Sequence, residues 1–292
     1  MAKNTVGASA SAKSQTPKNN AISILMFVFF LVLGILVVIP FYANFISSFK
    51  PGRDIVQYGL NLGIDLKRMS FDNYVYLFTG EHYYFRWFFN SMGLTIVQVT
   101  CVLMVCAFVA YGFACYRFKG RNVFFTLVLL TMMVPFEILM LPLYTEIINL
   151  HLADTWAGII LPGVTSSSTI FFFRQYLLSI PKEIIDAGRV DGCSEYGIYF
   201  RLIMPIMKPS FAAMAILNGM NSWNNFLWPL LVFRTDKNFT LPIGLRSLLT
   251  PYGNNYDLLI VGSFFSVIPL FILFLAFQRY FLDGMTAGAV KG

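Results

Sequence analysis

Residues 181–209 read PKEIIDAGRVDGCSEYGIYFRLIMPIMKP, a charged segment with three glycines that lies between long apolar stretches. Nine charged residues occur from position 174 to position 208: Arg174, Lys182, Glu183, Asp186, Arg189, Asp191, Glu195, Arg201 and Lys208. Charged side chains are costly in hydrocarbon, so this density predicts a segment that projects into water or onto a partner.

The composition of the whole chain indicates an integral membrane protein. Hydrophobic residues make up 57% of the 292 residues and charged residues only 12%, whereas soluble domains carry about 25% charged residues. The length suffices for several spans of about 20 residues with short loops, and so for one bundle without a large soluble domain. The four cysteines lie mostly in apolar runs and lack metal-binding spacing, which predicts buried side chains and no metal site.

Six apolar runs are each long enough to cross a bilayer of about 30 Å, which predicts an all-α domain over residues 22–282. The predicted spans are about 22–49, 88–116, 123–148, 157–178, 211–233 and 258–282. Residues 1–21 are polar and rich in Ser, Ala and Lys, so we expect a disordered tail rather than a cleaved signal peptide. Residues 283–292 are rich in Gly and Ala and predict a second tail, whose alternative interpretation is a frayed terminus.

The positions of Lys and Arg predict how these spans are oriented. With the N-terminus inside, 13 of the 21 basic residues fall in inner segments and 8 in outer ones. The short loop YRFKGR at 116–121 carries most weight, so we expect both termini in the cytoplasm, and the loop 181–209 there too, between spans four and five. The net charge of +7 is explained by basic residues that set the orientation of the spans and attract anionic lipid, so it does not require a nucleic-acid partner.

Local signals divide this loop into a helix-turn-helix. Pro181 and the acidic residues after it favour a helix over 181–190, where Arg189 follows Asp186 at a spacing that allows pairing. Asp191-Gly192 breaks that helix, and a second one begins at the Ser194 cap and ends near Pro205. An inert cytoplasmic connector is the alternative that these residues leave open.

The loop resembles the EAA loop of permease subunits in binding-protein-dependent ABC importers, whose pattern is roughly EAA, three residues, G, and then about nine residues to an I-x-x-P. Asp186-Ala187-Gly188 occupies the triplet, Gly192 the glycine, and Ile203 and Pro205 the end. The chain departs from the family at Asp186, usually Glu, and at Gly188, usually Ala. Further motifs are similar to the carbohydrate-uptake importers, specifically the second permease of the maltose-importer type: SFKP (48–51), MMVPFEILMLPLY (132–144), WNNFLWPLL (223–231) and GMTAGAVKG (284–292).

The resemblance implies a transport subunit, not an enzyme. GxxxxGK[ST] occurs nowhere in the sequence, so hydrolysis belongs to two partner ATPase subunits, which use ATP and Mg²⁺, while this chain binds no cofactor itself. In the family the loop sits in a cleft of an ATPase subunit and couples its closure to the transmembrane gate, and the C-terminal tail reaches toward the ATPases. The implied partners are a second permease, those ATPases, a solute-binding protein, an oligosaccharide and the bilayer of the bacterial inner membrane. The predicted coupling residues are Glu183, Asp186, Ala187, Gly188, Arg189, Asp191 and Gly192.

Polar residues inside apolar runs predict a substrate path. In NGMNSWNNFLWP (218–229), amides recur at helical spacing beside two indoles, a combination suited to sugar hydroxyls and pyranose faces. A carboxylate between Pro135 and Pro142 predicts a kinked third helix that faces a cavity. The predicted path residues are Glu137, Asn218, Asn221, Trp223, Asn225 and Trp228. Interhelical hydrogen bonding remains the alternative for the amides, and a neutral structural carboxyl the alternative for Glu137.

The sequence constrains the identity of the substrate less than it constrains the fold. The family resemblance favours an oligosaccharide, and basic residues in the outer loops lean toward an acidic uronate oligomer; a glycerol-phosphate or a monosaccharide are the alternatives. The outer segment 50–86 has five basic and four acidic residues, and we expect it to meet the solute-binding protein, although an aromatic belt also explains its tyrosines. From other classes, a channel predicts uptake without nucleotide, and a membrane-embedded enzyme would need a cluster of acids or histidines where the sequence offers only Glu137.

Overall fold

The computed structural model describes residues 17–59, 62–250 and 253–287, and its architecture is the predicted all-α bundle. Within these residues, three helices are long and apolar enough to cross a membrane singly: α1 (Pro17–Ser48), α4 (Tyr84–Cys115) and α15 (Tyr256–Ala287). Helix pairs that bend at short breaks bring the total to as many as six spans. The pairs are α5 (Arg121–Thr131) with α6 (Phe136–Asn149), bent by 96°; α7 (Trp156–Ile160) and η1 (Leu161–Gly163) with α8 (Ser167–Leu178), bent by 49°; and Glu195–Ile206 with α12 (Lys208–Trp223), bent by 74°.

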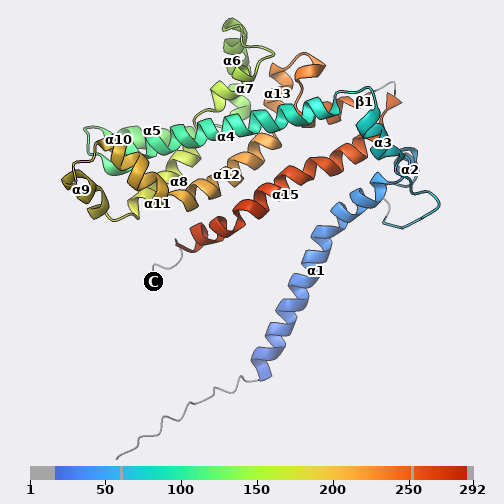
Figure 1. The fold of residues 1–292 in the computed structure, drawn as a ribbon, viewed down its shortest axis with the longest axis horizontal. Coiled ribbons are helices and arrows are strands. Elements are labelled where there is room, and N and C mark those ends of the chain that lie inside the picture. Colours follow the sequence, from blue (N-terminus) through green and yellow to red (C-terminus); the bar gives the residue numbers. More distant parts are fainter. Residues whose placement is uncertain (1–16, 60–61, 251–252, 288–292) are drawn as a thin grey trace, which may run out of the picture.

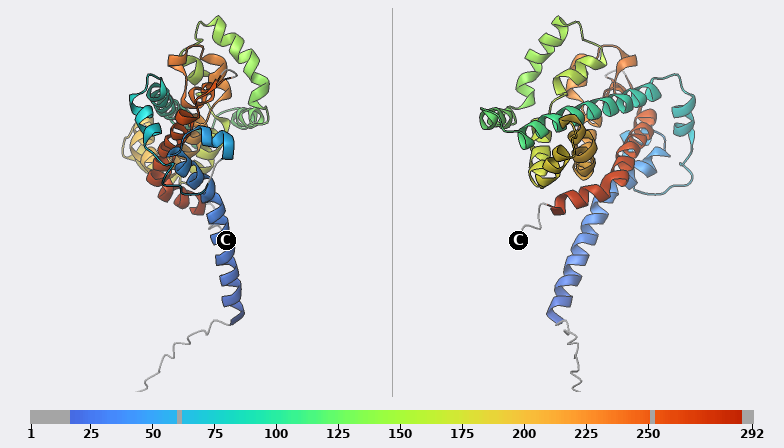
Figure 2. Two further views of the ribbon diagram at one scale, coloured as in Figure 1. Left: turned by 90° about the vertical axis from the view of Figure 1, so that its right-hand side faces the viewer. Right: turned by 60° about the vertical axis from the view of Figure 1, so that its left-hand side comes forward.

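Helix α4 is the centre of the bundle. It runs lengthwise across Figure 1 and packs on α8 and α12, while α12 packs on α15. Ala107, Ala110 and Ala114 are buried on α4, and such small side chains let neighbouring helices approach closely. The C-terminal end of helix α1 contacts α15. The rest of α1 lies outside the bundle, with every side chain from Ile22 to Tyr42 exposed (Figures 1 and 2).

Short elements close the end of the bundle opposite the charged loop: α2 (Arg53–Tyr58), α3 (Asp72–Thr79), η3 (Asp236–Asn238), α14 (Leu241–Ser247), and the antiparallel strands β1 (Leu249–Thr250) and β2 (Gly253–Asn254). The buried amide of Asn73 donates to the carbonyls of Ser48 and Lys50, at 3.0 and 2.8 Å. The SFKP motif is therefore the turn that fixes the end of α1 onto α3.

The prediction of one continuous fifth span over 211–233 is wrong. Helix α12 ends at Trp223, and α13 (Leu227–Val232) is a separate helix that packs on α6 and α7. Asn224 lies at the break, where its side-chain amide donates to the Met220 carbonyl, a local bond of the kind that competes with helix continuation. Pro229 has no backbone N–H with which to extend the helix.

The ends of the chain also differ from the predicted tails. Helix α1 begins at Pro17, inside the tail predicted for 1–21, and α15 continues to Ala287, inside the tail predicted for 283–292. Residues 1–16 and 288–292 lie outside the described residues. The predicted kink of the third span is a full break, because Pro135 begins α6 in an extended conformation, with φ −61° and ψ 133°.

Candidate functional site

The charged loop forms a helical hairpin at one end of the bundle, beside the C-terminal end of α4 (Figure 1). The first limb is α9 (Glu183–Val190); the second limb consists of α10 (Glu195–Gly197), the π-helix η2 (Ile198–Ile203) and α11 (Met204–Ile206). The predicted helix-turn-helix is confirmed, with Ser194 as the cap of the second limb, where its hydroxyl accepts from the Gly197 N–H at 3.1 Å.

Gly192 makes the turn between the limbs. Its φ of +77° is a left-handed conformation that glycine adopts without a Cβ penalty. The Cys193 N–H donates to the Gly188 carbonyl at 2.9 Å and the Gly192 N–H to the Arg189 carbonyl at 3.1 Å, the two bonds of a Schellman motif. No atom lies within 4 Å of the place a Gly192 Cβ would take, so backbone conformation requires the glycine and crowding does not.

The inner face of the hairpin belongs to the core of the bundle. Ile185, Ile198 and Ile203 are buried and pack in one cluster with side chains of α4 and α8, including Phe173. Because packed interiors are dense and transmit strain, a force on the hairpin acts directly on those two helices.

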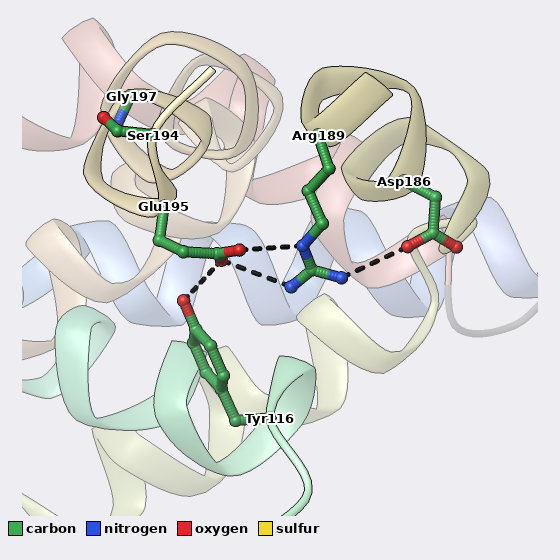
Figure 3. Close-up of polar contacts among 6 residues, drawn as sticks. All are labelled: Tyr116, Asp186, Arg189, Ser194, Glu195 and Gly197. Atoms are coloured by element: carbon green, nitrogen blue, oxygen red, sulfur yellow. Dashed lines mark hydrogen bonds and ion pairs between the residues drawn. The ribbon is translucent and has the colours of Figure 1, made fainter. Parts of the chain in front are cut away.

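On the outer face, one arginine joins both limbs (Figure 3). Arg189 donates to both carboxylate oxygens of Glu195, at 2.8 and 3.2 Å, and to Asp186 at 3.2 Å. The Tyr116 hydroxyl, at the end of α4, donates to Glu195 Oε2 at 2.6 Å. This hairpin network therefore ties α9, α10 and α4 together, and Glu195 is a central member that the predicted coupling residues did not include.

The network shifts the titration of its members. Hydrogen bonds from Arg189 and then from Tyr116 lower the pKa of Glu195 below its ordinary value of 4.5, and the bond to Glu195 raises the pKa of Arg189. Both side chains are more than 40% exposed, so water screens the pair and its contribution to stability is small.

The predicted coupling residues divide between the two faces of α9. Glu183, Asp186, Ala187 and Arg189 on α9, and Asp191 and Gly192 in the turn, are exposed. Gly188 is buried, and placing it on the contact face is wrong: a Cβ there would lie 2.7 Å from Leu202 and 3.1 Å from Ile198. The structure adds Val190, which is 87% exposed and gives the tip an apolar side chain that could be recognised only once the helix was placed.

The two predicted indoles do not line a path within this chain. Trp223 is buried and donates from Nε1 to the Ser266 carbonyl at 3.1 Å, and Trp228 is buried and donates to the Gly158 carbonyl at 3.2 Å. Both rings are packing residues, so their prediction as sugar-stacking surfaces is wrong. Buried indoles satisfy their N–H in this way, and sequence spacing does not reveal which face they occupy.

The predicted row of amides is also interrupted. Asn218 and Asn221 lie on α12, whereas Asn225 follows the end of that helix and cannot continue its face. Asn218 donates to Thr169 Oγ1 at 3.2 Å and to the Met214 carbonyl at 2.9 Å, while Asn221 is exposed.

Instead, a neutral polar band crosses the middle of the bundle. The Ser222 hydroxyl on α12 donates to Gln98 Oε1 on α4 at 2.8 Å, and Thr169 on α8 donates to Ser166 Oγ at 3.0 Å. The band comprises Thr95, Gln98, Ser166, Ser168, Thr169, Asn218 and Ser222, none of them charged. The runs LTIVQVT (94–100) and TSSST (165–169) contain five of the seven members of the band, and none of these five was among the predicted path residues.

Glu137 occupies the first turn of α6, directly after the break at Pro135. It is exposed in this chain, and its neighbours Ile138 and Leu141 are 68% and 72% exposed. The carboxylate thus lies on an apolar surface, away from the neutral polar band in sequence, and its assignment to the substrate path stays a prediction.

Comparison with protein families identifies the kind of chain. The family model "Binding-protein-dependent transport system inner membrane component" matches residues 104–287. The chain is 51% identical over 277 residues to the arabinooligosaccharides transport system permease protein AraQ of Bacillus subtilis (strain 168), covering 95% of this chain and 99% of the relative. It is 50% identical to the protein of the same name from Halalkalibacterium halodurans, covering 93% and 97%.

A more distant relative and a solved structure agree. The lactose transport system permease protein LacG of Rhizobium radiobacter is 37% identical over 204 residues, covering 70% of this chain and 74% of the relative. The crystal structure of a bacterial ABC transporter involved in the import of the acidic polysaccharide alginate contains a chain that matches with a TM-score of 0.80 at 21% identity, covering 92% of this chain and 100% of that one. At this identity the likeness shows the fold alone.

Proposed function

Because the chain belongs to the family of binding-protein-dependent transport system inner membrane components, as a permease of a carbohydrate ABC importer, we propose that it forms one half of the pathway for arabinose-containing oligosaccharides. The observation that carries this substrate class is the identity of 51% over 95% of the chain with an arabinooligosaccharide permease. Such a chain is a multi-pass protein of the inner membrane and a non-enzymatic transport component.

The neutral polar band supports a neutral sugar as the cargo. Hydroxyl and amide groups both donate to and accept from sugar hydroxyls, and the band offers them from α4, α8 and α12. An acidic uronate oligomer would require basic side chains at the same depth, and the only support for it is the basic residues of the outer loops. The neutral oligosaccharide is therefore the proposal, and the uronate is a competing substrate in its test.

The hairpin supplies the contact through which ATP hydrolysis drives the pathway. Its exposed face carries Asp186, Ala187 and Asp191, and its buried face packs on α4 and α8, so a partner ATPase that moves the hairpin also moves two spans. The remaining subunits are a second permease, two ATPases that use ATP and Mg²⁺, and a solute-binding protein that meets the opposite end of the bundle. This orientation puts both termini in the cytoplasm.

Transport by the reconstituted complex tests the proposal. The chain is purified with its partner permease and ATPases, placed in proteoliposomes, and supplied with binding protein and labelled arabinotriose. We expect uptake that requires ATP and Mg²⁺ and that a uronate trimer does not inhibit. Uptake by this chain alone without nucleotide would indicate a channel, and preferential uptake of the uronate would overturn the substrate class while leaving the permease assignment intact.

A further inference from the structure

Beside the hairpin network lies a cavity that the coupling function does not use. It has a volume of about 290 Å³ and lies between the C-terminal part of α4 and the second limb of the hairpin. Five aromatic rings and one carboxylate line it, and we call this group the aromatic cage: Phe108, Tyr111, Tyr116, Tyr196, Tyr199 and Glu195.

The rings of the cage are held at defined angles. Phe108 stacks on Tyr196 at 6.4 Å with an interplanar angle of 10°, and the same Phe108 meets Tyr199 edge-on at 5.3 Å. The ring centroids of Tyr111 and Tyr199 lie 5.0 Å apart. Aromatic faces arranged around a cavity attract organic cations, because the face of each ring carries negative electrostatic potential.

The polar atoms of the cage have unused capacity to accept hydrogen bonds. The Tyr199 hydroxyl is buried and has no hydrogen-bond partner among the described residues, whereas the Tyr111 hydroxyl interacts with that of Tyr116. Buried polar atoms are normally paired, so the Tyr199 hydroxyl is free to accept a hydrogen bond from a group that enters the cavity. Glu195 Oε1 accepts one bond, from Arg189, and a carboxylate oxygen can accept two.

The charge of the site also favours a cation. Among the described residues, Glu195 is the one charged side chain that lines the cage, and it is bonded to Arg189 outside the cavity (Figure 3). An entering ammonium group would donate to the free acceptor position on Glu195 and to the Tyr199 hydroxyl. A primary ammonium has three N–H donors for this purpose, whereas a quaternary ammonium has none.

A separate apolar groove lies farther along the same two elements, α4 and the second limb of the hairpin. It measures about 530 Å³, and Met104, Phe200 and Met204 are among its lining residues. Met104 lies one turn before Phe108 on α4, and Phe200 lies one turn after Tyr196 on the hairpin, so groove and cage follow one another along the same seam.

We propose that this seam binds a phosphatidylethanolamine molecule, with its ammonium in the aromatic cage and an acyl chain in the groove. The ammonium and the acyl chain of this lipid match the cage and the groove, whereas a lysine side chain from a partner subunit would match the cage alone. Since Glu195 also joins the hairpin network, the bound headgroup contacts the element that couples to ATP hydrolysis.

Lipid retention by the whole importer complex tests the proposal. The complex is equilibrated in nanodiscs with equal amounts of phosphatidylethanolamine, phosphatidylcholine and phosphatidylglycerol, and the lipids kept after extraction are counted by native mass spectrometry. We expect phosphatidylethanolamine to be retained preferentially. Tyr196→Ala, at an exposed ring of the cage, should lower that retention by about fivefold or more, and the matched control Tyr83→Ala, at an exposed tyrosine beside the other end of α4, should not.

A second variant distinguishes ligand recognition from simple packing. Tyr199→Phe keeps the ring but removes the unpartnered hydroxyl, so it should reduce the preference for phosphatidylethanolamine over phosphatidylcholine without reducing total lipid. Equal retention of these two lipids by the unmodified complex would overturn the proposal. So would a Tyr196→Ala complex that keeps as much phosphatidylethanolamine as Tyr83→Ala, or a photo-crosslinker at position 196 that captures a partner subunit instead of lipid.

Discussion

The hairpin network and the neutral polar band are both made of polar side chains that join helices, but they differ in charge and exposure. The hairpin network uses an arginine and two carboxylates that are 41% to 67% exposed. The neutral polar band uses hydroxyls and amides on half-buried helix faces, where a charge would be costly. The difference is in keeping with the two tasks that we propose: contact with a soluble protein at one end, and passage of an uncharged solute through the middle.

The two clusters also depend on their surroundings in different ways. The hairpin holds its shape through buried packing and a glycine turn, with the ions adding little because water screens them. In the neutral polar band Ser168 is exposed and the other members are half-buried or buried, so each bond among those other members has more influence on the local structure. We therefore expect backbone and packing changes to dominate at the hairpin and polar changes to dominate in the band.

The largest effect is expected from Gly188→Leu. The new side chain would collide with Leu202 and Ile198, and such overpacking costs roughly 1–3 kcal/mol or more. The thermal midpoint of the purified complex should fall, and ATP-dependent uptake should be lost. The control Ala187→Leu, at the exposed neighbour, should leave the midpoint unchanged and weaken ATPase association. Equal destabilisation by both variants would show that the inner and outer faces of α9 are assigned wrongly.

Gly192→Val should have the next largest effect. A β-branched residue at φ +77° costs about 1–2 kcal/mol of backbone strain, although no atom crowds the position. We expect uptake to fall while ATP hydrolysis continues, so the number of sugars moved per ATP decreases. Gly192→Asn, which tolerates the left-handed conformation better, should lose less. If valine and asparagine transport like glycine, the turn is not part of the coupling path.

How far the sequence predicted these two clusters depended on how local the signals were. The hairpin follows from neighbours in sequence: Ser194 caps, Gly192 turns, and both act within one or two turns of helix. The ring of contacts around Glu195 requires Tyr116, which is 79 residues away, and no local rule brings the two together. The resemblance to importer permeases located the loop but not its inner face.

Most of the neutral polar band was missed for the same reason. Trp223 and Trp228 are chemically suited to sugars, yet tertiary packing buried them against Ser266 and Gly158. Gln98 was overlooked because one amide in an apolar run carries no periodic signal; its role becomes visible only where Ser222 faces it from another helix. The helix break at Asn224 was likewise missed, because the high hydropathy of the surrounding residues predicts one continuous span.

Gln98→Leu is expected to have a moderate effect. Losing a hydrogen-bonding amide in a bilayer costs about 0.6–2 kcal/mol, so the apparent KM for the oligosaccharide should rise roughly threefold to thirtyfold. ATP hydrolysis stimulated by the binding protein should remain. Thr100→Val is the control, because Thr100 is exposed and donates to Ile96 of its own helix at 2.7 Å. A KM that does not change in Gln98→Leu would remove the band from the substrate path.

The smallest expected effect is a pH dependence of local stability, which the hairpin network should show and the neutral polar band should not. Arg189 and Tyr116 lower the pKa of Glu195 in the folded hairpin, so the stabilisation from this carboxylate is complete above its ordinary value of 4.5 and is lost as pH falls through the lower folded pKa. Amide protection factors, corrected for intrinsic exchange, should therefore decrease in residues 186–196 between pH 6 and pH 4, by at most about threefold because the pair is exposed. Protection near Gln98 should not change, since nothing in the neutral polar band titrates there. Glu195→Gln cannot titrate and should abolish the pH dependence in the hairpin; if the dependence persisted, a group other than Glu195 would control the hairpin, and the contrast between the two clusters would not rest on this carboxylate.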